Sequence, residues 1–173
     1  MNEHYLYPGM LFAEQETHRV TTVLGSCIAV CLFDPIRRVG GINHFMLPLW
    51  NGEGLPTPRY GNVAINALIE RLQGFGCLTT RLQAKLFGGA AMWDNTNNLV
   101  SVGERNIDMA WRMLERYGIP VVAKDLGGSA SRKIIFFTET GEVLLRRQHS
   151  TLQSERRGGD EIAAYSPTGN KTA

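Results

Sequence analysis

Long apolar runs are missing from this sequence. No segment offers the roughly eighteen consecutive apolar residues that a membrane-spanning helix needs. The N-terminal MNEHYLYPGM also lacks the basic start and uninterrupted apolar core of a secretory signal. We therefore expect a cytoplasmic protein with no direct membrane insertion.

Clustered charge of one sign is also scarce. The 173 residues hold 18 Lys and Arg against 16 Asp and Glu, a formal net charge of +2. A phosphate-binding face needs gathered Lys and Arg, whereas these arginines are scattered apart from four in the polar C-terminal stretch, Arg146, Arg147, Arg156 and Arg157. Nucleic acid is therefore not expected as a partner.

Cysteine is too sparse for a disulfide framework and wrongly spaced for a metal site. Cys27, Cys31 and Cys77 are odd in number and show no C-x-x-C spacing, and no two histidines have helical spacing. The glycine pairs in FGGAAMW and DLGGSASR lack the Lys-Ser/Thr ending of a P-loop, so they are predicted to be turns or site-shaping loops. We expect no metal and no cofactor.

What the sequence does contain indicates one domain of α+β class. Residues 27–33 are apolar or small on both faces, which predicts a buried strand, and Asp34-Pro35 then marks a turn into a second strand through GGINHFMLP. Apolar residues at helical spacing predict one helix within residues 60–72, ended by Gly74. The same spacing predicts another around residues 107–114, ended by Gly118.

Strands outnumber helices in the rest of the chain. Strand-like runs occupy residues 81–87, 120–125, 133–138 and 142–146, the last two joined as a hairpin. Periodicity and apolar content then fall away. The sequence therefore predicts a folded domain over residues 1–146 and a disordered tail over residues 147–173.

The first two predicted strands bring a thiol toward a histidine. A two-residue turn at Pro35 and Ile36 would place Cys27 directly opposite His44. A loop longer by two residues would make them diagonal neighbours on the same face, whereas a one-residue slip would send His44 to the other face. The pairing thus depends on a parity that the sequence leaves open.

Such a pair suits nucleophilic catalysis. His44 could take the thiol proton, giving a thiolate and an imidazolium that attack an amide carbonyl and then protonate the leaving group. A third group should hold the other ring nitrogen, and the candidates are Thr21, Thr22, Ser26 and Asn43. Main-chain N–H groups of residues 25–27 could face the oxyanion. The competing interpretation is that Cys27 is a small core residue, as we expect Cys31 and Cys77 to be.

Several motifs in order resemble one family. LGSCIAVCLFDP, GGINHFMLP, RYGNVAINALI, AKLFGGAAMW, VGERNIDMAWRMLERYGIPVVAKDLGG and RKIIFFTETGEVLLR are similar to the chemoreceptor glutamine deamidases, the CheD family. The resemblance runs from about residue 9 to residue 146. It departs at Ser131, where glycine or proline is expected, so the shape of that loop is in question.

The resemblance implies a protein-glutamine glutaminase that hydrolyses selected glutamine side chains on methyl-accepting chemotaxis receptors, in support of adaptation. It implies Cys27 as the nucleophile, His44 as the base and Thr21 as the residue associated with them. It also implies a layered β-sandwich flanked by helices, like the deamidating domain of cytotoxic necrotizing factor toxins. A CheC-like chemotaxis phosphatase is an implied partner.

Two alternatives stay open at this point. The chain could be a binding module that regulates the phosphatase, with deamidation secondary. Alternatively, the same thiol attack could lead to transglutamination or peptide cleavage, because the outcome depends on what enters the site after ammonia or amine leaves.

Overall fold

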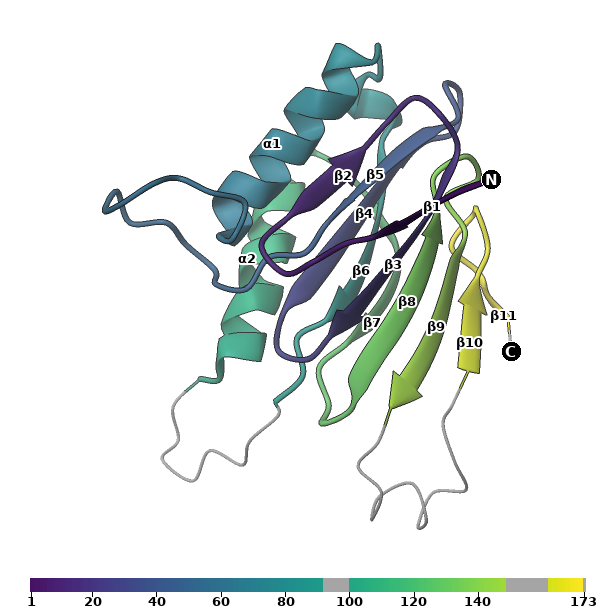
Figure 1. The fold of residues 1–173 in the computed structure, drawn as a ribbon. Coiled ribbons are helices and arrows are strands. Elements are labelled where there is room, and N and C mark those ends of the chain that lie inside the picture. The colour runs from purple at the N-terminus through teal and green to yellow at the C-terminus, as the bar shows by residue number, and fades with distance from the viewer. Residues whose placement is uncertain (92–99, 149–161, 173) are drawn as a thin grey trace.

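The chain folds into three layers: a pair of helices, a sheet, and a second sheet (Figure 1). The structure, a computed structural model, describes residues 1–91, 100–148 and 162–172. Its elements are β1 (Asn2–Tyr5), β2 (Leu11–Ala13), β3 (His18–Leu24), β4 (Ile28–Asp34), β5 (Val39–Asn43), α1 (Gly61–Gly74), the short 3-10 helix η1 (Thr79–Arg81), β6 (Gln83–Gly88), α2 (Val102–Tyr117), β7 (Val121–Leu126), β8 (Ser131–Phe137), β9 (Val143–Gln148), β10 (Ile162–Tyr165) and β11 (Lys171–Thr172).

The described strands form two sheets. One sheet has the order β1-β3-β8-β9-β10-β11 and the other β2-β5-β4-β6-β7. The β1–β3 and β6–β7 pairs are parallel, and the other pairs are antiparallel. This arrangement confirms the predicted α+β class and the layered sandwich flanked by helices.

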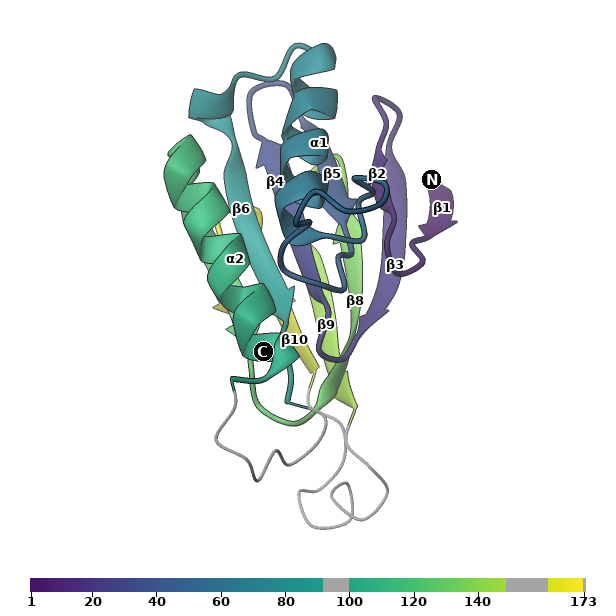
Figure 2. The same cartoon turned by 90° about the vertical axis from the view of Figure 1, so that its left-hand side faces the viewer.

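Both faces of the five-stranded sheet are buried. Helices α1 and α2 cover one face (Figure 2), where Ile65, Leu68 and Leu114 pack against the sheet. The other face meets the six-stranded sheet through a second core that includes Phe87 and Phe136. Because β4 lies between these cores, all seven of its residues are buried, which confirms the strand predicted there.

Both helices end where the sequence indicates. Helix α1 closes at Gly74, and α2 ends at Tyr117 with Gly118 in the left-handed conformation at φ 69°. Ser101 caps α2 by accepting the N–H of Glu104. Within the described residues, no helix is both long and apolar enough to cross a membrane.

The predicted C-terminal tail needs correction. Strand β10 pairs with β9, and the Tyr165 hydroxyl donates to buried Asp125 at 3.1 Å. The folded chain therefore continues past residue 146. The part of the tail prediction that falls on residues 149–161 lies outside the described residues.

Candidate active site

The loop that carries Cys27, residues 25–27 between β3 and β4, is held by its carbonyl groups. In chain order these three carbonyls accept from Ala90 N–H at 3.0 Å, Asn106 Nδ2 at 3.0 Å and Gly89 N–H at 2.9 Å. In Figure 1 this loop, the end of β6 and the β7–β8 connection lie together at the lower end of the molecule. Two segments distant in sequence, residues 89–90 and helix α2, thus hold the loop that carries the thiol.

This anchoring also sets the direction of the N–H groups in the loop. In a trans peptide the N–H points opposite to the carbonyl of the same unit. The N–H groups of Ser26 and Cys27 share peptide units with the first two anchored carbonyls, so they point away from the anchors. Among the described residues they donate to no other residue, and the Cys27 N–H lowers the pKa of its own thiol.

Gly88 packs directly against the main chain of Cys27. Its φ is +110°, and a Cβ there would lie 2.1 Å from the Cys27 carbonyl oxygen, so only glycine permits this approach. Gly127 N–H in turn donates to the Gly88 carbonyl at 2.9 Å, and Ala91 N–H to Gly128 at 2.8 Å. Both glycine pairs therefore lie in connections that contact one another next to the Cys27 loop.

A buried ion pair stabilises these glycine loops. Arg132 Nε binds Asp125 Oδ1 at 2.7 Å, and the same guanidinium donates to the carbonyls of Gly127 at 2.8 Å and Gly88 at 3.4 Å. Burial alone would raise the pKa of Asp125, but hydrogen bonds and charge from Arg132 and Arg147 outweigh it and hold that pKa below its usual value. Asp125 therefore stays charged and keeps Arg132 in place.

The register of β4 and β5 determines how His44 sits relative to Cys27. A four-residue turn, 35–38, joins the strands, and a bridge pairs Ile28 with Phe45. Position 27 therefore lies opposite position 46, with His44 diagonal to Cys27 on the same face. This turn is the longer of the two loops expected from the sequence, and it keeps Cys27 and His44 on the same face of the sheet.

The His44 ring is oriented by Thr22. Thr22 Oγ1 lies 2.7 Å from His44 Nδ1 and donates to the Leu6 carbonyl, also at 2.7 Å. A hydroxyl has a single proton, and Leu6 O can only accept it, so Nδ1 must donate to Thr22. The neutral ring therefore carries its proton on Nδ1 and a lone pair on Nε2, which is buried and has no hydrogen-bond partner among the described residues.

Thr21 does not contact His44. Successive side chains of a strand alternate between faces, and Thr22 is the buried one of the two. The Thr21 carbonyl accepts the Leu6 N–H at 2.8 Å, and among the described residues the His44 ring bonds Thr22 and makes no hydrogen bond to Thr21. Asn43, another candidate, uses Oδ1 to accept the Val30 N–H at 3.0 Å.

Burial moves both titratable groups of the site toward neutrality. It lowers the pKa of His44 to about 4, and it raises the pKa of the Cys27 thiol against a smaller lowering by the Cys27 N–H. At neutral pH the resting site therefore holds a thiol and a neutral imidazole. The thiolate–imidazolium pair expected from the sequence would therefore form only when the proton passes from Cys27 to His44.

The other cysteines differ from Cys27. Cys31 and Cys77 are buried in the two cores, whereas Cys27 is half-buried. The interpretation of both as structural residues is confirmed. Across the described ranges, no group of three or more His, Cys, Asp or Glu side chains could hold a metal ion.

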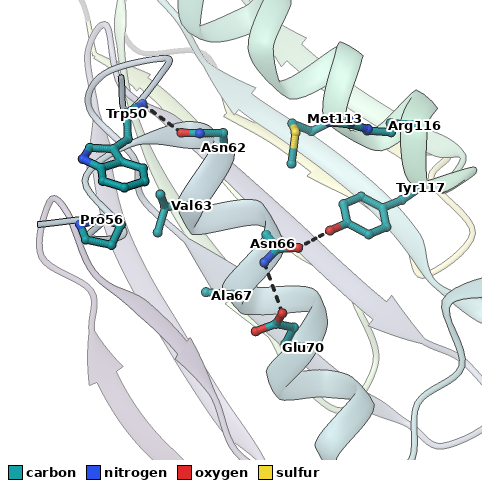
Figure 3. A pocket seen from close by; sticks show the side chains of 10 residues that line it. All are labelled: Trp50, Pro56, Asn62, Val63, Asn66, Ala67, Glu70, Met113, Arg116 and Tyr117. Atoms are coloured by element: carbon teal, nitrogen blue, oxygen red, sulfur yellow. Dashed lines mark hydrogen bonds between the residues drawn. The ribbon is translucent and has the colours of Figure 1, made fainter. Parts of the chain in front are cut away.

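A hollow of about 640 Å³ lies elsewhere, on the helical face (Figure 3). Its wall comes from α1, α2 and the segment before α1, and Asn66 there bonds both Tyr117 and Glu70. Cys27, Thr22 and His44 do not line it. This hollow is separate from the thiol site.

Comparisons with known proteins agree on one family. The family model described as CheD chemotactic sensory transduction matches residues 46–147. A probable chemoreceptor glutamine deamidase CheD of Trichlorobacter lovleyi is 50% identical over 147 residues, covering 85% of this chain and 91% of the relative. Proteins with the same name from Sulfurimonas denitrificans and Rhodospirillum rubrum are 44% and 41% identical, covering 85% and 91% of this chain and 95% and 89% of the relatives.

Proposed function

Because the chain belongs to the CheD family, we propose that it hydrolyses selected glutamine side chains on chemoreceptors to glutamate. The relatives are named as chemoreceptor glutamine deamidases, and the site described above offers the groups that such a reaction needs. In this proposal the enzyme is a cytoplasmic protein-glutamine glutaminase that supports adaptation and needs no cofactor.

The first step joins the thiol to the substrate. Cys27 Sγ bonds to the carboxamide carbon while its proton passes to His44 Nε2, and the carbonyl oxygen becomes an oxyanion. The outward N–H groups of Ser26 and Cys27 stabilise this oxyanion. The carbon–nitrogen bond then breaks, the nitrogen takes the proton from His44, and ammonia leaves behind a thioester.

Water completes the reaction at the same base. His44 Nε2 takes a proton from water as the oxygen bonds to the thioester carbon, and the carbon–sulfur bond then breaks. The sulfur recovers the proton, so one amide and one water give one carboxylic acid and one ammonia. Thr22 holds the proton-bearing Nδ1 side of the ring through both steps, which keeps Nε2 available.

The observation that carries this proposal is the buried Nε2 of His44, which has no partner in the described ranges and lies on the strand face that His44 shares with Cys27. The test is mass analysis of receptor fragments incubated with wild type, Cys27→Ala or Cys31→Ala protein. We expect wild type and Cys31→Ala to convert the amide to the acid, and Cys27→Ala not to do so. Retained conversion by Cys27→Ala would refute the mechanism.

The same assay separates the alternatives. A primary amine added to the reaction would be incorporated by a transglutaminase, and a protease would shorten the fragment; we expect neither product. A CheC-like phosphatase is proposed as a partner at the same site. It should slow deamidation competitively, and undisturbed deamidation at saturating phosphatase would place it elsewhere.

A further inference from the structure

One polar side chain of α2 connects the two halves of the candidate site. Asn106 is completely buried, and its Nδ2 donates to the carbonyls of Ser26 and Met46, each at 3.0 Å. Both partners are carbonyl oxygens, which accept only, so the amide nitrogen must be the atom that faces them. Ser26 directly precedes Cys27, and Met46 lies two residues after His44.

Asn106 occupies a position where the helix otherwise buries small or apolar side chains. It shares its face with Gly103, Ala110 and Leu114. Asparagine is a weak helix former, and within the described part of the chain its Oδ1 is buried without a partner, so this choice costs stability. An apolar residue would serve packing better, which indicates that the amide has another role.

The helix is also seated closely enough to act as a rigid support. A Cβ on Gly103 would lie 2.4 Å from the Gly89 carbonyl oxygen, so the absence of a side chain lets α2 approach the loop that anchors Cys27. One turn later, Asn106 bonds the main chain of Ser26 and of Met46 from this fixed base. A single amide group thus sets the positions of the Cys27 loop and of the segment that follows β5.

We propose that Asn106 is a positioning residue that sets the separation and relative orientation of Cys27 and His44. This inference rests on the proposed function, because it assigns those two groups to the reaction. Asn106 has no bond to the sulfur or to the imidazole and acts through the main chain on either side of them.

The test compares Asn106→Asp and Asn106→Ser with Thr138→Val. Aspartate keeps the shape but presents acceptors to two carbonyls, and serine is too short to reach both. Thr138 is the matched control, since it is also buried and its Oγ1 bonds the main chain of His18 at both N and O, away from the site. Melting temperature and circular dichroism report the folded fraction of each variant.

For receptor fragments we expect the Asn106 variants to lose at least tenfold in kcat per folded molecule, with KM within about twofold of wild type. Thr138→Val should lower the melting temperature without changing kcat per folded molecule. Wild-type kcat in both Asn106 variants, or a loss in Thr138→Val that matches theirs, would overturn the proposal.

A second readout needs no receptor. The rate of Cys27 alkylation by iodoacetamide is measured in wild type and in Asn106→Ser, each with and without the additional substitution His44→Gln. In each background, the ratio of the rate with His44 to the rate with His44→Gln reports how strongly the imidazole affects the thiol. We expect a ratio different from one in wild type and a ratio near one in Asn106→Ser. An unchanged ratio would refute positioning by Asn106 even if wild type deamidates receptors, whereas a collapsed ratio with no wild-type deamidation would refute only the proposed function.

Discussion

Replacing Thr22 with valine removes the hydroxyl at His44 Nδ1 while keeping the branched shape of the side chain. The hydroxyl accepts from Nδ1 at 2.7 Å, and this bond gains strength when the ring becomes an imidazolium during the reaction. Hydrogen bonds to charged groups contribute about 1.5–3 kcal/mol. If this hydrogen bond is lost in the transition state, the activation free energy rises by that amount, and kcat falls roughly tenfold to a hundredfold.

The assay is ammonia release from receptor fragments, with kcat and KM measured for Thr22→Val, Thr22→Ser and Thr21→Val. Serine keeps the hydroxyl and should retain most of the activity. Thr21→Val should change kcat by less than about twofold, because its side chain leaves the sheet on the other face. A larger loss in Thr21→Val than in Thr22→Val would refute the assignment of the orienting hydroxyl.

Three further predictions follow from the same geometry. Cys27 alkylation should accelerate only as the pH rises past the usual thiol pKa of about 8.5, since burial raises the Cys27 pKa; an inflection near neutral pH would instead reveal a preformed ion pair. Unfolded His44 gains a proton below pH 6.5 and folded His44 only near 4, so the free energy of unfolding is highest above pH 6.5 and falls as the pH drops from 6.5 toward 4. Urea unfolding should show wild type losing about 3 kcal/mol more than His44→Gln between those pH values, and equal losses would contradict burial of a neutral ring. Gly88→Ala should abolish most activity and cost about 1–3 kcal/mol of stability or more, whereas Gly74→Ala, with no atom within 4 Å, should be neutral; a fully active Gly88→Ala enzyme would show that the loop tolerates displacement.

The parts of the fold predicted from the sequence are those with strong local signals. Strand β4 was predictable because a run buried on both faces is apolar throughout, and α2 because its periodicity ends at a glycine with positive φ. Strand β10 was missed because it has only four residues, and its burial depends on pairing with β9. The sequence of residues 162–165 gives no local signal that this segment pairs with β9.

The candidate site was predictable except for the strand parity. The apolar strand and the turn that follows it place Cys27 and His44 on neighbouring strands, but the turn length decides whether they share a face and whether they are opposite or diagonal. The choice between Thr21 and Thr22 depends on how β3 faces the other sheet, which local sequence does not specify. The role of Asn106 had one visible signal, a polar residue on the apolar stripe of a helix.

Strand β10 and the end of β9 contribute to the support beneath the Cys27 loop. Tyr165 and Arg147 both bind the Asp125 carboxylate, which holds Arg132 against the glycine loops beneath Cys27. A chain shortened to residue 146 would keep the thiol and the histidine but remove two of the three groups that satisfy that carboxylate. The structural support of this site therefore extends beyond the segment that carries Cys27 and His44, and it includes Tyr165.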